Sequence, residues 1–146
     1  MTRIHMRSAL VSAAVAAALL TAAPASAEML MFKADLKAST EVPANTSKAT
    51  GLVDANYDTV AKKLSWTVTS TGLSGAATGA HFHGPAEAGK TAAPVVPISG
   101  SLASPIKGEA TLTDAQATDL RAGKWYFNIH TAAHKDGEIR GQMMKK

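Results

Sequence analysis

The stretch KLSWTVTS, residues 63–70, shows most clearly which class of fold the chain adopts. Its apolar residues Leu64, Trp66 and Val68 alternate with serines and threonines. Successive side chains of a β-strand point to opposite faces of a sheet, so this period of two indicates a strand. The stretch therefore predicts a sheet with one face against a hydrophobic core and the other in solvent.

Further short alternating runs recur along the chain, separated by Gly, Pro, Asn and Asp, which favour turns. They are MLMFKADLKA (29–38), GLVDANYD (51–58), ATGAHFHG (77–84), APVVPIS (93–99), IKGEATLT (106–113), KWYFNIH (124–130) and GEIRGQMM (137–144). Closely spaced short strands of this kind predict an all-β fold. We expect an antiparallel Greek-key β-sandwich or flattened barrel of about seven to eight strands.

One stretch, LTDAQATDLRAG at residues 112–123, departs from this pattern and predicts a short helix near residues 113–122. Thr113 is placed as the N-cap, and Gln116 follows three residues later, which is the spacing of a capping box. Gly123 is placed to end the helix.

The N-terminal 27 residues have the composition of a secretion signal. Arg3 and Arg7 precede an apolar run at residues 9–20, and Ala25-Ser26-Ala27 matches the small-residue cleavage site. An uncleaved anchor is the alternative, but the apolar run is short for a membrane span. We expect cleavage after Ala27 and a periplasmic or secreted protein, residues 28–146, that forms a single domain without a membrane span.

Charge and cysteine content exclude several classes of function. The chain has 15 Lys and Arg against 11 Asp and Glu, and Arg3 and Arg7 belong to the signal, so the remaining residues are near neutral. No basic cluster is interleaved with aromatic residues, which disfavours nucleic-acid binding. The chain has no cysteine and therefore no disulfide, thiolate ligand or cysteine nucleophile. A metal site would have to use His, carboxylate, Met or backbone oxygen.

Four histidines form a candidate metal site. His81 and His83 share one face of their predicted strand, about 6.5–7 Å apart at the Cα atoms. His130 lies on the polar face of another strand, opposite Phe127. If the two strands are neighbours, three imidazoles converge outside the core, and His134 on the following loop supplies a fourth ligand. An all-nitrogen set suits Cu(II) or Zn(II), so the metal hypothesis predicts a copper or zinc ion.

The alternative is a purely structural role for the same residues. His81 and His83 immediately precede Gly84-Pro85, and their side chains would then hydrogen-bond to the backbone and fix this corner. The residue pattern leaves both interpretations open, because alternation gives the face of each side chain and not its contacts.

The blocks AHFHGPAEAGKTAAPVVPI (80–98), KWYFNIHTAAHKDGEIRGQM (124–143) and STEVPANTSKATG (39–51) resemble the CHRD domain, a module named after chordin and also found in exported bacterial proteins. The resemblance implies a secreted all-β domain in which the first two blocks pack together. It implies no known reaction, and in chordin the domains serve an extracellular signalling antagonist. The positions that match the family's signature are His81, His83, Gly84, Pro85, Asn128, His130, Thr131, Gly137, Glu138, Arg140, Gly141 and Gln142.

Other polar residues are expected to have ordinary structural roles. Arg140 could bind an anion, but we expect it to pair with Glu138 or with a carboxylate on a neighbouring strand. We also expect Glu41 and Glu109 to lie on solvated faces rather than to form a general acid/base pair.

Two pairs of apolar residues have a similar choice of roles. Trp66 and Trp125 could stack on a sugar, although core packing is the expected role. Met143 and Met144 could bind Cu(I), but we expect them to lie in an exposed tail.

Three functional classes follow. The leading one is a non-catalytic exported binding protein that takes up copper or zinc in the cell envelope. The second is a structural or protein-interaction module with structural histidines. The third is a metalloenzyme similar to the copper-zinc superoxide dismutases, which also have an H-x-H strand pair. It is the least favoured, because the disulfide of those enzymes cannot form without cysteine.

Overall fold

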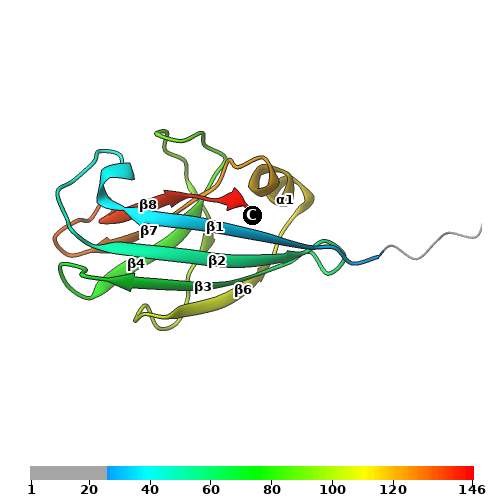
Figure 1. Cartoon of the computed structure of the whole chain (residues 1–146), viewed down its shortest axis with the longest axis horizontal. Helices are drawn as coiled ribbons and strands as arrows, with labels where there is room; N and C mark the ends of the chain where they lie inside the picture. Colours follow the sequence, from blue (N-terminus) through cyan, green and yellow to red (C-terminus); the bar gives the residue numbers. More distant parts are fainter. Residues whose placement is uncertain (1–25) are drawn as a thin grey trace, which may run out of the picture.

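A computed structural model describes residues 26–146 of the chain (Figure 1). The signal peptide predicted at residues 1–27 lies outside the described residues except for its last two positions. No helix among the described residues has the length and apolar character needed to cross a membrane.

The described residues form antiparallel strands and a single α-helix, which confirms the predicted all-β class. The strands are β1 (Met29–Lys37), β2 (Thr50–Asp58), β3 (Lys63–Thr71), β4 (Ala77–His83), β5 (Pro94–Pro97), β6 (Ile106–Thr111), β7 (Tyr126–Thr131), β8 (Ile139–Gln142) and β9 (Met144–Lys145). A 3₁₀ turn, η1 (Ala38–Thr40), follows β1, and the helix α1 spans Asp114–Arg121.

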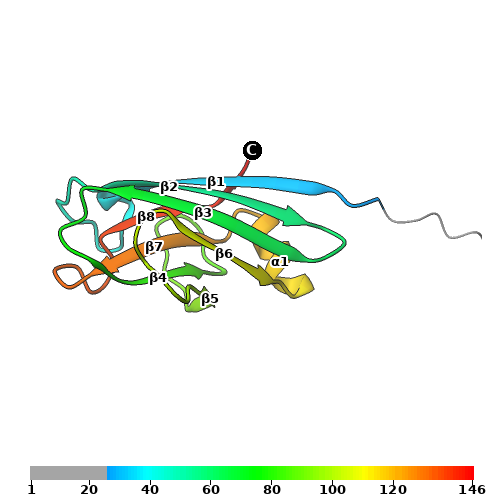
Figure 2. The same cartoon turned by 90° about the horizontal axis from the view of Figure 1, so that it is seen from below.

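The strands form one sheet that curls into a nearly closed, flattened barrel. Their order is β5-β4-β7-β8-β1-β2-β3-β6, with β9 paired to β1. Seen from below, β1, β2 and β3 form one layer, and β4, β5 and β7 lie in the other (Figure 2). Since β5 and β6 are the two ends of the path, the barrel has a seam between them.

The core fills the space between the layers and follows the predicted alternation. Leu64, Trp66 and Val68 are buried, as the KLSWTVTS stretch predicts. An aromatic cluster occupies the centre: Phe82 lies with its ring centroid 5.1 Å from Trp66 and 4.8 Å from Phe127. Trp66 and Trp125 are thus core residues, as expected.

The helix confirms its sequence signals. The Thr113 hydroxyl accepts a hydrogen bond from the Gln116 backbone N–H at 3.2 Å, and the Gln116 side chain accepts one from the Thr113 N–H at 2.9 Å. Gly123 follows the helix with φ at 72°, the left-handed conformation that favours glycine after a helix. Leu120 is fully buried, so α1 covers one end of the barrel, away from the β7–β8 turn (Figure 1).

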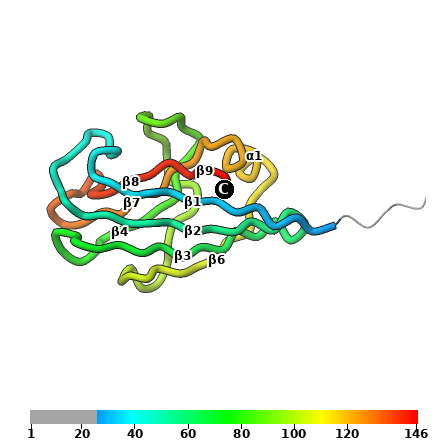
Figure 3. The backbone as a smooth tube through the Cα atoms, in the orientation of Figure 1, coloured from blue at the N-terminus to red at the C-terminus, as the bar shows by residue number. Residues whose placement is uncertain are grey.

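The C-terminal segment differs from the expected exposed tail. Met143 is fully buried in the core, and its N–H donates to the Trp125 carbonyl at 2.8 Å. Met144 is exposed, as expected, but it lies in β9, which pairs with β1 (Figure 3). Met143 lies two positions after Gly141 and four after the buried Ile139, so the alternation of residues 137–144 places it on the same face, and the expectation of an exposed tail is wrong for this residue.

Candidate metal centre

The sheet register brings three of the four predicted histidine ligands together. β4 and β7 are antiparallel neighbours, with His81 opposite Asn128 and Gly79 opposite His130. Ala80 and Phe82 of β4 point into the core, so His81 and His83 project from the other face. The predicted convergence of the imidazoles required these two strands to be neighbours, and this is confirmed.

Gly79 provides room for this convergence. A Cβ atom on Gly79 would lie 3.3 Å from His81 Cε1 and 3.6 Å from His130 Cδ2. The glycine therefore leaves the space opposite His130 to the imidazole of His81. The two rings lie with their centroids 5.1 Å apart, and the ring of His83 lies 5.5 Å from that of His81.

The nitrogen atoms of His81, His83 and His130 have a spacing suited to one ion. Taking one ring nitrogen from each residue, all three lie within 4.8 Å of one another. His81 Nδ1 and His130 Nε2 are 3.3 Å apart. Two nitrogens bound to one tetrahedral ion at 2.0–2.1 Å lie about 3.3 Å apart, so this pair already has the required separation.

Backbone carbonyls define which nitrogen of two of the rings carries a proton. His83 Nδ1 lies 2.9 Å from the Ala92 carbonyl, and His130 Nδ1 lies 2.9 Å from the Lys135 carbonyl. A carbonyl only accepts, so each Nδ1 carries its hydrogen and donates. In a neutral ring the Nε2 atom then has a free lone pair, which is the arrangement typical of metal-binding histidines.

Two hydrogen bonds compete with an ion for these nitrogens. His130 Nε2 accepts from His81 Nδ1. His83 Nε2 lies 3.0 Å from the side-chain amide of Asn128, and because Nδ1 of a neutral His83 ring already donates to Ala92, Nε2 accepts here from the Asn128 amide N–H, with the amide oxygen and nitrogen interchanged. A bound ion would replace the contact between His81 and His130. It would also require the Asn128 amide to turn away from His83. The same contacts can serve a structural role, so the geometry accommodates both interpretations of the histidines.

The environment favours neutral imidazoles. Burial, followed by the neighbouring His130, lowers the pKa of His81 below its ordinary value of 6.5. Burial also lowers the pKa of His83, and its hydrogen bond to the Ala92 carbonyl opposes this effect. Neutral imidazole is the form that binds metal. His81 and His130 are half-buried and His83 is buried, so the centre opens to solvent on one side.

His134 lies apart from this group. It is in the turn that follows β7, where its backbone N–H donates to the Thr131 carbonyl at 3.1 Å. The group of closely spaced ligand atoms contains His81, His83 and His130 without it.

Three planar groups, those of His83, Tyr126 and Arg140, are stacked at one side of the candidate metal centre. The Tyr126 ring stacks on His83 with the centroids 4.7 Å apart and the planes at 3°. The Arg140 guanidinium lies over the Tyr126 ring, 3.4 Å from its centroid, and also donates a hydrogen bond to the Lys90 carbonyl. Arg140 is 2% exposed, so the stack holds a buried cation beside the candidate metal centre.

A family model of the CHRD domain matches residues 32–143. The chain belongs to the CHRD domain family. No curated protein and no solved structure matches the chain. The family match covers both histidine strands and confirms the resemblance inferred from their motifs.

Two signature glycines of this CHRD domain are explained by close approaches. A Cβ on Gly84 would lie 2.5 Å from Trp125 Cδ1, and a Cβ on Gly141 would lie 2.3 Å from the Asp35 carbonyl oxygen. Gly141 therefore lets β8 lie close against β1, where Lys37 pairs with Arg140. Gly84 keeps the chain after His83 close to Trp125 in the core.

Glu138 of this CHRD domain is buried among hydroxyl groups and not paired with Arg140. Its carboxylate is fully buried and accepts hydrogen bonds from the hydroxyls of Ser47, Ser74 and Thr131 at 2.6–2.7 Å. Burial alone raises the pKa of Glu138, but these hydrogen bonds outweigh it and lower the pKa to about 2. Of the two kinds of partner expected for Arg140, Glu138 is therefore wrong, because hydroxyl groups and the Ser74 backbone N–H, and not a cation, stabilise this carboxylate.

Glu41 is the residue that sequence reasoning missed. It was expected on a solvated face, but it is 5% exposed, and its Oε1 has no hydrogen-bond partner. Burial raises its pKa to about 7, opposed mainly by the charge of Arg140. It follows η1 and lies outside any strand, so alternation could not locate it. Glu109, by contrast, is exposed and pairs with Lys63 at 2.9 Å, as expected for a solvated face.

Proposed function

We propose that this CHRD domain is a non-catalytic binding protein that holds one copper or zinc ion through His81, His83 and His130. The observation that carries the proposal is the convergence of three imidazole nitrogens within 4.8 Å. The Nδ1 anchors of His83 and His130 support it, because they direct Nε2 toward the shared centre.

The donor set supports the choice of metal. The converging group contains imidazoles alone, without cysteine or carboxylate. Nitrogen ligands favour Cu(II) and Zn(II), whereas Ca(II) and Mg(II) require oxygen. Three imidazoles leave a fourth coordination position for water or another ligand.

The proposed location is the periplasm or the extracellular space. The N-terminal pattern of Arg3, Arg7, the apolar run at residues 9–20 and the Ala25-Ser26-Ala27 site supports export. The proposed role is therefore metal handling in the cell envelope. Mass determination of the N-terminus of the protein recovered from the producing cell tests this, with Glu28 expected as the first residue.

Isothermal titration with Cu(II) and, separately, Zn(II) tests metal binding. The wild-type protein is expected to bind one ion with a dissociation constant of about 1 μM or tighter. His130→Ala should weaken binding by at least a hundredfold, while His134→Ala serves as the matched control and retains the wild-type affinity. Equal binding by all three proteins, or no heat with the wild type, would contradict the proposal. Far-UV circular dichroism shows whether each variant is folded.

A structural role for the histidines is the second candidate, and the bonds of His83 to Ala92 and Asn128 favour it. In that case His83→Ala lowers the free energy of unfolding by about 1–3 kcal/mol, with no metal dependence in the wild type. Turnover of superoxide by the metal-loaded protein, lost in His130→Ala, would instead assign an enzyme.

A further inference from the structure

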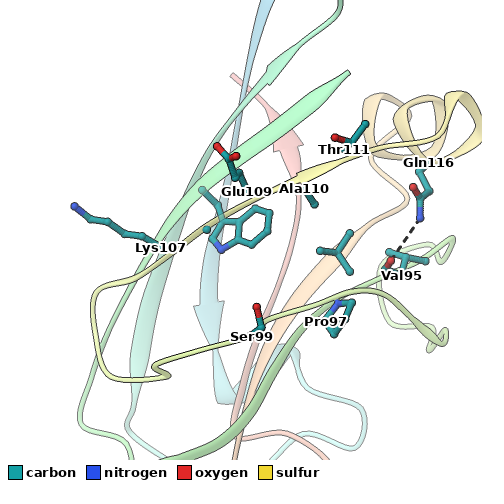
Figure 4. A pocket seen from close by; sticks show the side chains of 11 residues that line it. Val95, Pro97, Ser99, Lys107, Glu109, Ala110, Thr111 and Gln116 are labelled. Carbon is teal, nitrogen blue, oxygen red and sulfur yellow. Dashed lines mark hydrogen bonds between the residues drawn. The ribbon is translucent and has the colours of Figure 1, made fainter. Parts of the chain in front are cut away.

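The seam of the barrel contains a cleft that the proposed metal function does not use. It encloses about 370 Å³ between β5 and β6, the two ends of the sheet (Figure 4). Its lining comes from four elements that are distant in sequence: Val95–Pro97 and Ser99, Lys107–Thr111, Trp66 of β3 and Gln116 of α1.

The two walls of the cleft are sheet edges. β6 pairs with β3 on one side, so alternate residues of β6 direct their N–H and C=O groups toward the seam. On the opposite wall, Val95 lies between Pro94 and Val96, which pair with β4. The Val95 carbonyl faces the cleft, because it accepts a hydrogen bond from the Gln116 side chain at 3.4 Å (Figure 4).

Trp66 brings a buried donor to the same cleft. It is cross-strand from Gly108, and a Cβ there would lie 2.5 Å from Trp66 Cζ2 and 3.1 Å from Nε1. The missing side chain lets the indole lie against β6 at the seam. Trp66 is 6% exposed, and its Nε1–H has no acceptor. A buried donor without an acceptor is destabilising, which points to an acceptor supplied by a bound partner.

We propose that the cleft binds an extended peptide segment of a partner protein, which adds as a strand along β6 and supplies an acceptor to Trp66 Nε1. Donors and acceptors alternate along a sheet edge, and an extended main chain offers the complementary alternation. β5 contributes less, because Pro94 and Pro97 have no N–H and leave Val95 as its seam-facing donor.

The charges on β6 define which peptides the cleft prefers. Lys107 and Glu109 project on the exposed side of β6, and Glu109 already pairs with Lys63 at 2.9 Å. An acidic residue directly across from Lys107 on an added strand would make a favourable cross-strand pair. The selected segment is therefore expected to carry an acidic residue among residues of high β propensity.

A phage-displayed library of random 12-residue peptides provides the probe. The protein is used for selection, and the enriched peptides are synthesised and titrated while the indole N–H resonances are followed by NMR. Saturable binding that shifts the Trp66 indole N–H and the β6 amides supports the proposal. The same peptide with N-methyl groups on alternate residues should lose binding, because methylation removes the main-chain donors.

Matched tryptophan variants separate strand addition from nonspecific binding. Trp66→Phe keeps the aromatic packing and removes the donor, so peptide affinity should fall roughly three- to tenfold. Trp125→Phe removes the other unpartnered indole donor, which lies outside the cleft, and should leave the affinity unchanged. Two results would overturn the proposal: no enriched peptide, or binding insensitive to both Trp66→Phe and N-methylation. The metal-site variant His130→Ala should bind the peptide normally, so the two proposals fail independently.

Discussion

At the scale of single residues, two buried glutamates of this domain respond to pH in opposite directions. Glu138 is held as a carboxylate by three hydroxyl groups, and Glu41 is buried with one oxygen unpartnered. Their pKa values are about 2 and about 7, on either side of the ordinary value of 4.5. The environment, and not the residue type, therefore decides which of the two is charged in the folded protein at mildly acidic pH.

Replacement of Glu41 should remove part of the pH dependence of stability. Because folding raises the pKa of Glu41 from 4.5 to about 7, its contribution is complete below 4.5 and is lost as the pH rises through 7. Glu41→Gln stays neutral and should exceed the wild type at pH 8 by about 3 kcal/mol in free energy of unfolding, and by little at pH 5. Urea unfolding at both pH values measures this. The exposed variant Glu109→Gln is the control, and a constant difference between wild type and Glu41→Gln across pH would refute the argument.

Replacement of Glu138 should have the opposite pH signature. Folding lowers the pKa of Glu138, so its contribution is complete above 4.5 and is lost as the pH falls from 4.5 toward 2. Glu138→Gln should reduce the free energy of unfolding by about 3 kcal/mol at pH 7. The deficit should shrink at pH 3 in chemical denaturation. Glu87→Gln, on the exposed surface, should change little, and an undiminished deficit at pH 3 would rule out the proposed charge-based cause.

At the scale of elements, Gly141 allows β8 to lie close to the backbone of β1. A Cβ on Gly141 would lie 2.3 Å from the Asp35 carbonyl oxygen, which belongs to the backbone and cannot move alone. Gly141→Ala should therefore lower the free energy of unfolding by about 2–3 kcal/mol and speed hydrogen exchange of β1 amides near Asp35. Gly75→Ala is the control, because a Cβ there meets no atom within 4 Å. Equal stability of the two variants would show that β8 and β1 separate without cost.

The elements also show how far the sequence alone predicts this fold. Period-two alternation placed His81, His83 and His130 on outward faces, and capping residues placed α1, because both depend on local backbone geometry. The pairing of β4 with β7 is a long-range contact, so alternation could state it only as a condition.

The missed positions have local physical causes. Consecutive residues of β8 are buried on both faces, so alternation does not tell whether Glu138, which directly precedes β8, is exposed. Glu41 follows a 3₁₀ turn, where a strand pattern has no meaning. The burial of Glu138 and that of Glu41 could therefore not be derived from residue spacing.

At the scale of the whole molecule, the fold presents two independent surfaces: the histidine centre on β4 and β7, and the cleft between β5 and β6.

Protons should compete with the metal ion for the imidazole nitrogens of the histidine centre. The lowered pKa values of His81 and His83 favour neutral rings at pH 7, so metal affinity should be higher at pH 7.5 than at pH 5.0. The affinity should fall as the rings are protonated at lower pH. Titrations at pH 7.5, 6.5 and 5.0 check this, and an affinity unchanged at pH 5.0 would exclude imidazole ligands.

A crystal structure of the protein loaded with one equivalent of Cu(II) or Zn(II), with anomalous data at the metal edge, shows directly whether the three histidines bind one ion. One anomalous peak is expected about 2.0–2.1 Å from a ring nitrogen of His81 and from Nε2 of His83 and His130, with the Asn128 side chain displaced from His83. A peak held by other residues, or three histidines that keep their mutual hydrogen bonds beside a metal-free centre, would contradict the proposed metal centre.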